Sequence, residues 1–159
     1  MAISAADGIQ RSPLLTPAAA PAGAAGTLSA TYSTTSTTAV SSAFGVSFQA
    51  STTSVRLIGM ATITNNTATD GVTLTLYRST AAIPAAGAAP GGSDVALYAI
   101  TRTISVASNP DAIPILIVDS GRTVGSTYYY YLALAAVTGG TASLVSGTNA
   151  TTLTADAVA

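Results

Sequence analysis

The side chains of this 159-residue chain that could carry acid–base, metal or ionic chemistry are five arginines and six aspartates, because the sequence contains no Lys, Glu, His or Cys. Without His there is no imidazole base and the commonest metal ligand is missing. Without Cys there is no disulfide, thiolate nucleophile or zinc cluster. A net charge of −1 provides no basic stripe for nucleic acid and no polybasic patch for a membrane. We therefore expect a protein that is not an enzyme, with no cofactor, no metal, no nucleic-acid partner and no membrane partner.

The aspartates lie in segments with the residue types of turns. Four of them are placed this way: Asp70, Asp94, Asp111 and Asp119. Paired carboxylates could act on a glycoside, or bind Ca²⁺ together with Asn65 and Asn66. Their spacing matches no known loop pattern, and Asp favours turns for its local hydrogen bonds, so we favour the turn interpretation. Three arginines lie within predicted strands, where they either pair with an Asp across an interface or face solvent: Arg56, Arg78 and Arg102.

The tyrosines are concentrated in the segment 127–137, TYYYYLALAAV. As a strand it sends Tyr128 and Tyr130 to one face and Tyr129 and Tyr131 to the other. Four tyrosines cannot all enter one small core, and Tyr is enriched at interfaces. We expect one pair to face the core and the other a subunit interface, to which we assign Tyr129 and Tyr131. The alternative is that the second pair covers the surface of the domain.

The elements that position these residues are short strands rich in Thr, Val, Ile and Tyr, separated by turn residues. We expect strands near 28–35, 44–50, 54–64, 71–79, 95–107, 113–119, 127–137, 141–146 and 151–158. The segment 83–93 is too rich in Pro and Gly for a strand and predicts a surface loop. No window has a sustained helical period. The fold class is therefore all-β, an antiparallel jelly roll or β-sandwich of eight to nine strands.

Alternation predicts which faces are buried. In 72–78, Val72, Leu74 and Leu76 share one face. In 55–63, apolar residues fall on both faces, with Ile58 and Met60 opposite the core-facing set, so we expect this strand to be covered on both sides. We assign Ile58 and Met60 to the subunit interface. The strand 113–119 is also apolar on both faces, and its Pro114 fits the strand start or an edge.

The N-terminal segment 1–26 has a proline about every four residues among alanines and glycines, which predicts an extended arm, followed by a sandwich domain over 27–159. The apolar anchors of the arm are Ile3, Ile9, Leu14 and Leu15. They predict either a segment that lies in a groove of a neighbouring subunit or a frayed tail.

A surface this poor in charge favours association, so we expect a subunit of an assembly. GC-rich coding bias is an alternative source of part of this composition. The N-terminus lacks the pattern of a secretory signal, and the longest apolar stretch, 128–137, is too short to span a bilayer. A virion protein assembled in the host cytoplasm would fit these features.

The order of segments resembles the TNF/C1q-like jelly rolls of tailed-phage structural proteins over about residues 28–158. The likeness is carried by five segments in order: 46–50 (VSFQA), 55–58 (VRLI), the Asn65-Asn66 turn with 72–78 (VTLTLYR), 127–134 (TYYYYLAL) and a GGTAS turn. The resemblance implies a trimer with the tyrosine-bearing strand near the threefold axis.

It also implies a capsid decoration (cement) protein, a head fibre or a tail-fibre module. The expected function is a decoration protein on the virion, which binds the major capsid protein at the outer capsid surface as a homotrimer and stabilises the shell. Residues 1–26 would reach neighbouring capsid subunits. The alternative is a fibre or receptor-binding module that recognises host-surface glycan.

Overall fold

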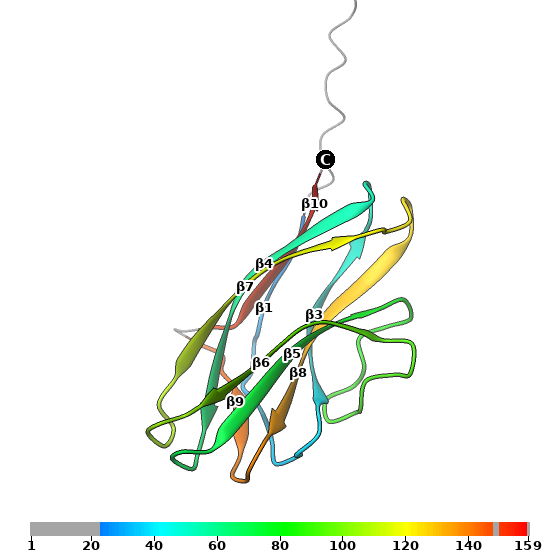
Figure 1. The fold of residues 1–159 in the computed structure, drawn as a ribbon. Helices are drawn as coiled ribbons and strands as arrows, with labels where there is room; N and C mark the ends of the chain where they lie inside the picture. Colours follow the sequence, from blue (N-terminus) through cyan, green and yellow to red (C-terminus); the bar gives the residue numbers. More distant parts are fainter. Residues whose placement is uncertain (1–22, 148–149, 159) are drawn as a thin grey trace, which may run out of the picture.

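The computed structural model describes residues 23–147 and 150–158, and over these residues it consists of ten strands joined by turns and loops (Figure 1). The strands are β1 (Ala24–Thr27), β2 (Tyr32–Thr34), β3 (Val40–Gln49), β4 (Ser54–Asn65), β5 (Gly71–Ser79), β6 (Val95–Thr103), β7 (Asp111–Ser120), β8 (Thr127–Ala136), β9 (Ala142–Leu144) and β10 (Thr152–Val158). The described residues include no helix long and apolar enough to cross a membrane.

The strands form two antiparallel sheets that pack face to face. In the first, here called sheet A, the order is β1-β10-β4-β9-β2, and β7 pairs with the other side of β4. In sheet B the order is β3-β8-β5-β6. From β2 onward the chain changes sheet at every connection except β5 to β6 and β9 to β10. This exchange between two four-stranded layers, with β2 and β9 as short additions, is the expected jelly-roll sandwich.

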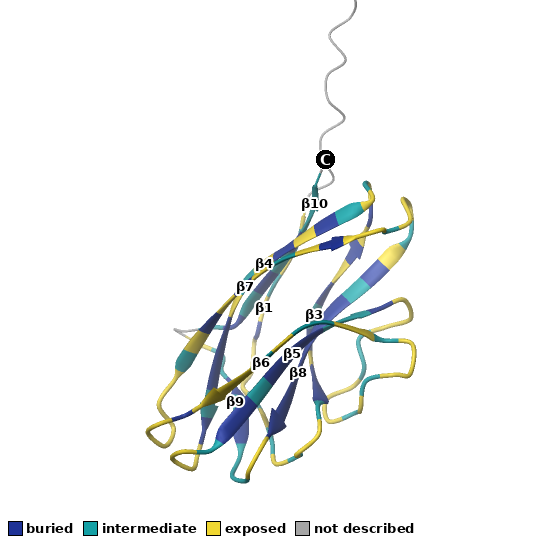
Figure 2. Cartoon of the chain, in the orientation of Figure 1, coloured by how far each residue is buried: buried dark blue, intermediate teal, exposed yellow. Residues whose placement is uncertain are grey.

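The core lies between the sheets and follows the alternation of the sequence. Val72, Leu74 and Leu76 of β5 are buried in it, as predicted. From β8, Tyr130 and Leu132 enter the same cluster, whereas Tyr131 between them does not. Figure 2 shows β5 and β8 as mostly buried, β4 as a mixture of buried and exposed residues, and β6 as mostly exposed. The strands with the clearest apolar pattern in the sequence, β4, β5 and β8, therefore lie in the centre of their sheets.

From residue 40 onward each predicted strand overlaps an observed one, but β3 begins four residues before the predicted 44–50 and β6 ends four residues before the end of the predicted 95–107. The largest differences lie at the N-terminal end. The predicted strand 28–35 is reduced to β2, because the chain there crosses from the β10 edge to the β9 edge of sheet A. Residues 24–26, predicted in the arm, belong to β1 and pair with β10. At Gly26 an added Cβ would lie 3.2 Å from Val46 Cγ1, so β1 packs closely against β3.

Two predictions about breaks in the pattern are confirmed. The segment between β5 and β6, residues 80–94, contains no strand. Pro114 lies in β7, which pairs with β4 alone among the described strands and so forms an edge of sheet A.

Candidate functional site: the exposed apolar face of β4 and β7

The outer face of sheet A carries large apolar side chains that no described part of the chain covers. Ile58 and Met60 of β4 are 39% and 47% exposed, and Leu116 and Val118 of β7 are 73% and 55% exposed. In the register, Ile58 lies opposite Leu116 and Met60 lies opposite Pro114. These five residues are called the sheet A patch below.

The patch follows from the sequence of the two strands. On the inward face of β4 and β7, Leu57, Ile63 and Ile113 are fully buried in the core and Ile117 is partly buried. The residues between them must point to the other side, because side chains alternate along a strand. Packing of the two sheets buries only the inward face of a strand that is apolar on both faces, and no described segment of the chain covers the outward face of β4 and β7.

The size and place of the patch favour contact with a folded surface. Burying one aliphatic side chain of this size is worth about 1.5–3 kcal/mol, and contiguous exposed apolar patches mark interaction sites. The ladder between β4 and β7 runs through Pro114 without a shift of register, so the nitrogen of Pro114 faces the free edge of β7. That nitrogen has no hydrogen to donate, which interrupts strand addition at this edge. The patch is therefore suited to packing of side chains.

The charges around the patch are paired within the chain. Arg56 lies opposite Asp156 in the ladder, with Nη2 3.4 Å from Oδ2, and both side chains are partly exposed. Arg102 and Asp111 approach to 3.9 Å across the β6–β7 connection. Both arginine side chains are also about half exposed, so they face solvent, as one of the two expectations had it, while each lies near an aspartate of its own chain.

The two tyrosines assigned to the interface lie on the far side of the molecule, on the outer face of sheet B. Tyr131 is 0% exposed, its ring stacks on Tyr77 at a centroid distance of 5.4 Å, and its hydroxyl donates to Asp94 Oδ2 at 2.7 Å. Burial, together with the hydrogen bond to Asp94, raises the pKa of Tyr131 far above its ordinary value. Tyr129 is half-buried on the same face.

The cover over Tyr131 is the segment between β5 and β6, called the 80–94 loop below. Ser41 of β3 holds it at three points: its hydroxyl donates to the Pro84 carbonyl at 2.9 Å, its N–H to the Ala88 carbonyl at 2.8 Å, and its carbonyl accepts from Gly87 N–H at 2.8 Å. At the other end, Asp94 also accepts from Gly91 N–H at 2.8 Å. The 80–94 loop therefore covers apolar side chains on the outer face of sheet B, whereas no described segment covers those on the outer face of sheet A.

The carboxyl of Asp94 is tuned by this arrangement. Its burial acts to raise the pKa, but hydrogen bonds from Tyr131, Ser79 and the Gly91 backbone favour the charged form and bring the pKa below its usual value. Asp94 is therefore ionised at neutral pH while it holds the end of the loop to β8.

The four residues predicted at the interface thus form two pairs on opposite faces. Ile58 and Met60 are brought together with Leu116 and Val118, and the two tyrosines are kept apart from them by the full thickness of the sandwich. The interface assignment remains a prediction. Leu116 and Val118 belong to the strand that the sequence marked as apolar on both faces, and that signal could have added them to the set.

A buried polar cluster around Asp119 was not foreseen. Asp119 Oδ1 accepts from Arg78 Nη1 at 2.7 Å, and its Oδ2 lies 3.3 Å from Arg122 Nε and accepts from the Tyr130 hydroxyl at 3.0 Å. Burial, with the adjacent Asp119 charge, raises the pKa of Tyr130 far above its ordinary value. Because Asp119 comes from sheet A and Arg78 and Tyr130 come from sheet B, the cluster ties the two sheets together. Both carboxylate oxygens of Asp119 are thus engaged within the cluster.

Among the described aspartates, Asp70 also has a partner from the fold. Asp70 Oδ1 accepts from the Thr138 hydroxyl at 2.8 Å, joining the turns before β5 and after β8. In the described part of the chain, no group of three or more Asp, Glu, His or Cys side chains could hold a metal ion. The arm residues Ile3, Ile9, Leu14 and Leu15 lie outside the described residues.

Comparison with known proteins gives few matches. No family model matches the sequence, and no curated protein matches it significantly. Three solved structures of infectious bursal disease virus align with 88% of this chain: the Gx strain (TM-score 0.45, 13% identity), the Gt strain (0.43, 14%) and the VP2 subviral particle (0.42, 13%). The aligned part spans only 38–39% of those chains. Similarity at this level carries no conclusion about the role of this chain.

Proposed function

We propose that this chain is a structural protein of a virus particle, a decoration protein that binds the outer surface of the capsid as a homotrimer and stabilises the shell. The observation that carries the proposal is the sheet A patch, an apolar face without a cover on a chain that has almost no charge to keep it apart from other subunits. The jelly-roll strand order, which the resemblance to phage structural proteins implied, supports it.

In this proposal the sheet A patch is the contact between copies. Ile58 and Met60 of one copy meet a neighbouring copy, with Leu116 and Val118 extending the contact along β7. The paired charges Arg56 and Asp156 allow the surface to be buried without an isolated charge. The proposal does not require Tyr131, which is already covered by its own chain.

The function is mechanical, and it involves no reaction, cofactor, nucleic acid or membrane. The N-terminal arm would bind the major capsid protein and each trimer would link several capsid subunits, so the shell could open only after these contacts were also broken. Binding that favours the complete shell stabilises it by mass action. The chain would be made and assembled in the host cytoplasm and would end on the capsid surface.

The oligomeric contact is tested by light scattering on the purified protein. We expect a trimer for the native chain, and dissociation for Leu116→Asp, because the carboxylate would be buried against an apolar neighbour. Val106→Asp is the matched control, since Val106 is also well exposed but lies in the β6–β7 loop outside the patch. A native chain that is monomeric at micromolar concentration would overturn the assignment of the patch.

The particle contact is tested by deleting the arm. The deletion must stop at residue 22, because Ala24–Thr27 pair with β10 and their loss would damage sheet A. We expect the shortened protein to remain trimeric and to lose binding to particles of the parent virus, measured by co-sedimentation. Undiminished binding would show that the arm is not the segment that binds the particle. A cryo-EM map that places the chain in a tail fibre would exclude the decoration role.

A further inference from the structure

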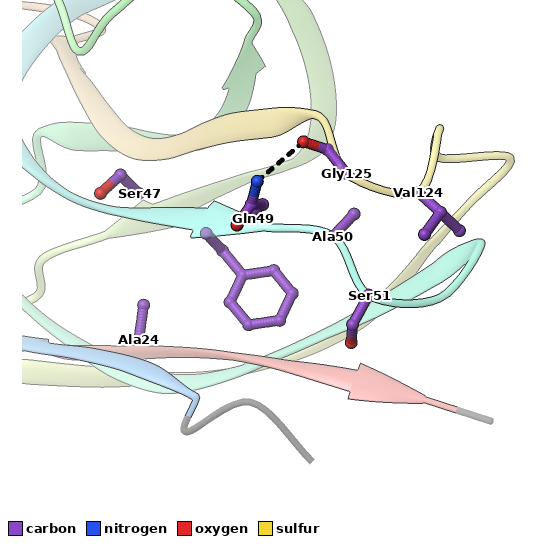
Figure 3. Close-up of a pocket in the computed structure, with 8 residues that line it drawn as sticks. Ala24, Ser47, Gln49, Ala50, Ser51, Val124 and Gly125 are labelled. Atoms are coloured by element: carbon purple, nitrogen blue, oxygen red, sulfur yellow. Dashed lines mark hydrogen bonds between the residues drawn. The ribbon is translucent and has the colours of Figure 1, made fainter. Parts of the chain in front are cut away.

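A groove of about 490 Å³ opens between β1 and β3, on the side of the sandwich away from β6 and β7 (Figure 3). Its lining comes from Ala24 of β1, from Phe48 and Gln49 of β3, and from the loop residues Ala50 and Val124. The described residues that line it are uncharged and mostly apolar. A volume of this size is within the range of sites that take a small ligand or a few side chains.

The groove is bordered by two strands that lie at the ends of their sheets. Among the described strands, β1 pairs only with β10, and β3 pairs only with β8. Gln49 Nε2 donates to the Gly125 carbonyl at 3.0 Å and holds the β7–β8 loop against β3, as drawn in Figure 3. Val124 of that loop is exposed at the rim. The groove is thus held open by a fixed rim and offers apolar surface.

The segment of the chain just before β1 is a suitable occupant of this groove, because it is joined to a residue that lines the groove. The first residue after the N-terminal segment, Gly23, passes so closely over β10 that an added Cβ would collide with the Asp156 carboxylate. The next residue, Ala24, already lines the groove. Residues 12–22, SPLLTPAAAPA, are uncharged like the groove and contain two large side chains, Leu14 and Leu15. The chain between Leu15 and Ala24 can reach about 30 Å, which is enough to turn back over the groove.

We propose that Leu14 and Leu15 dock into this groove of their own chain and hold the base of the arm against the domain. Apolar side chains of both partners leave water, and the prolines limit the entropy that the segment loses on docking. If Leu14 and Leu15 dock in this way, only the residues before Leu14, which include Ile3 and Ile9, are left to bind the virus particle. The inference refines the arm of the proposed function, but docking itself does not depend on any particle.

The absence of cysteine from the chain allows a direct test by engineered disulfides. A full-length Leu15→Cys, Val124→Cys variant should oxidise to a cross-linked monomer, because docking brings the two Cβ atoms close enough for a disulfide. The control is Leu15→Cys with Val106→Cys. Val124 follows the C-terminal end of the ten-residue β7, whereas Val106 precedes its N-terminal end, so the two sites are separated by the length of this strand. A strand of ten residues is about 33 Å long. We expect cross-linking at least about tenfold faster in the first variant at low protein concentration, a ratio that corresponds to about 1.4 kcal/mol.

Two outcomes would overturn the proposal. Equal rates in the two variants would mean that the segment does not dock, and cross-linked dimers would mean that the groove receives a second copy. A second measurement uses full-length Leu14→Ser, Leu15→Ser against Ile3→Ser, Ile9→Ser. Hydrogen exchange at Ser47–Ser51 should become faster only in the first. If particle binding requires the arm but exchange is the same in both variants, the groove assignment fails and the proposed function stands.

Discussion

The two outer faces of the sandwich carry similar sequence signals and have different covers. On sheet B, Tyr131 stacks on Tyr77 and donates to Asp94 at the end of the 80–94 loop, so its own chain covers it. On sheet A, Ile58, Met60 and Leu116 stand open. A strand that is apolar on both faces therefore indicates that a second layer exists, and it does not indicate whether that layer is the same chain or another one.

Between the two faces lies the Asp119 cluster, and its loss should have the largest effect. Asp119→Ala leaves Arg78 and Tyr130 buried without their shared acceptor, and Arg78 is only 13% exposed. Removing one partner of a buried ion pair costs about 3–5 kcal/mol of unfolding free energy. Denaturant unfolding measures it, with Asp156→Ala at the exposed Arg56 pair as control. An equally small loss in both variants would show that the cluster does not tie the sheets.

The next effect separates the covered face from the open one. Tyr131→Ala creates a cavity under the 80–94 loop and should lower the unfolding free energy by about 3 kcal/mol or more, as for other large buried aromatic residues. Met60→Ala, on the open face of sheet A, should change the value for the isolated subunit by about 0.5 kcal/mol or less. Similar losses for the two, measured at concentrations where the subunits are separate, would contradict the difference between the faces.

Much of this architecture follows from sequence alone, because strand period and turn chemistry are local. The burial of Val72, Leu74 and Leu76 needed only alternation. The burial of Tyr131 did not follow, because its cover is a loop of alanines and glycines that is held by Ser41, 43 residues before Pro84 in the chain. Asp119 was placed in a turn for the same reason: Arg78 reaches it only when the two sheets stack. Polar contacts between residues far apart in the chain depend on the fold, and residue types alone do not predict them.

Acid should loosen the cover of sheet B before the rest of the domain. The pKa of Asp94 is lower in the folded chain than the value of about 3.9 for an unfolded aspartate. Its charge therefore contributes stability that is present above about pH 3.9 and is lost as the pH falls through the folded pKa. Hydrogen exchange in the 80–94 loop should increase over that range in the native chain.

Asp94→Asn is the control for this dependence. It should give faster exchange in the 80–94 loop already at neutral pH, with little further change in acid. If exchange in the loop of the native chain does not change with pH, and Asp94→Asn behaves like the native chain, Asp94 does not hold the cover.

The smallest effect on the subunit is expected at the centre of the open face. Leu116→Thr removes apolar surface that is already in water, and Thr suits a strand as well as Leu does, so the melting temperature in dilute solution should hardly change. At high concentration the native chain should gain stability, because association stabilises the folded state by mass action, and the variant should gain less. Melting curves over a hundredfold range of concentration make this comparison. A native melting temperature that is independent of concentration would mean that the open face has no partner in a second copy, and the sheet A patch would then have to be matched to a different surface.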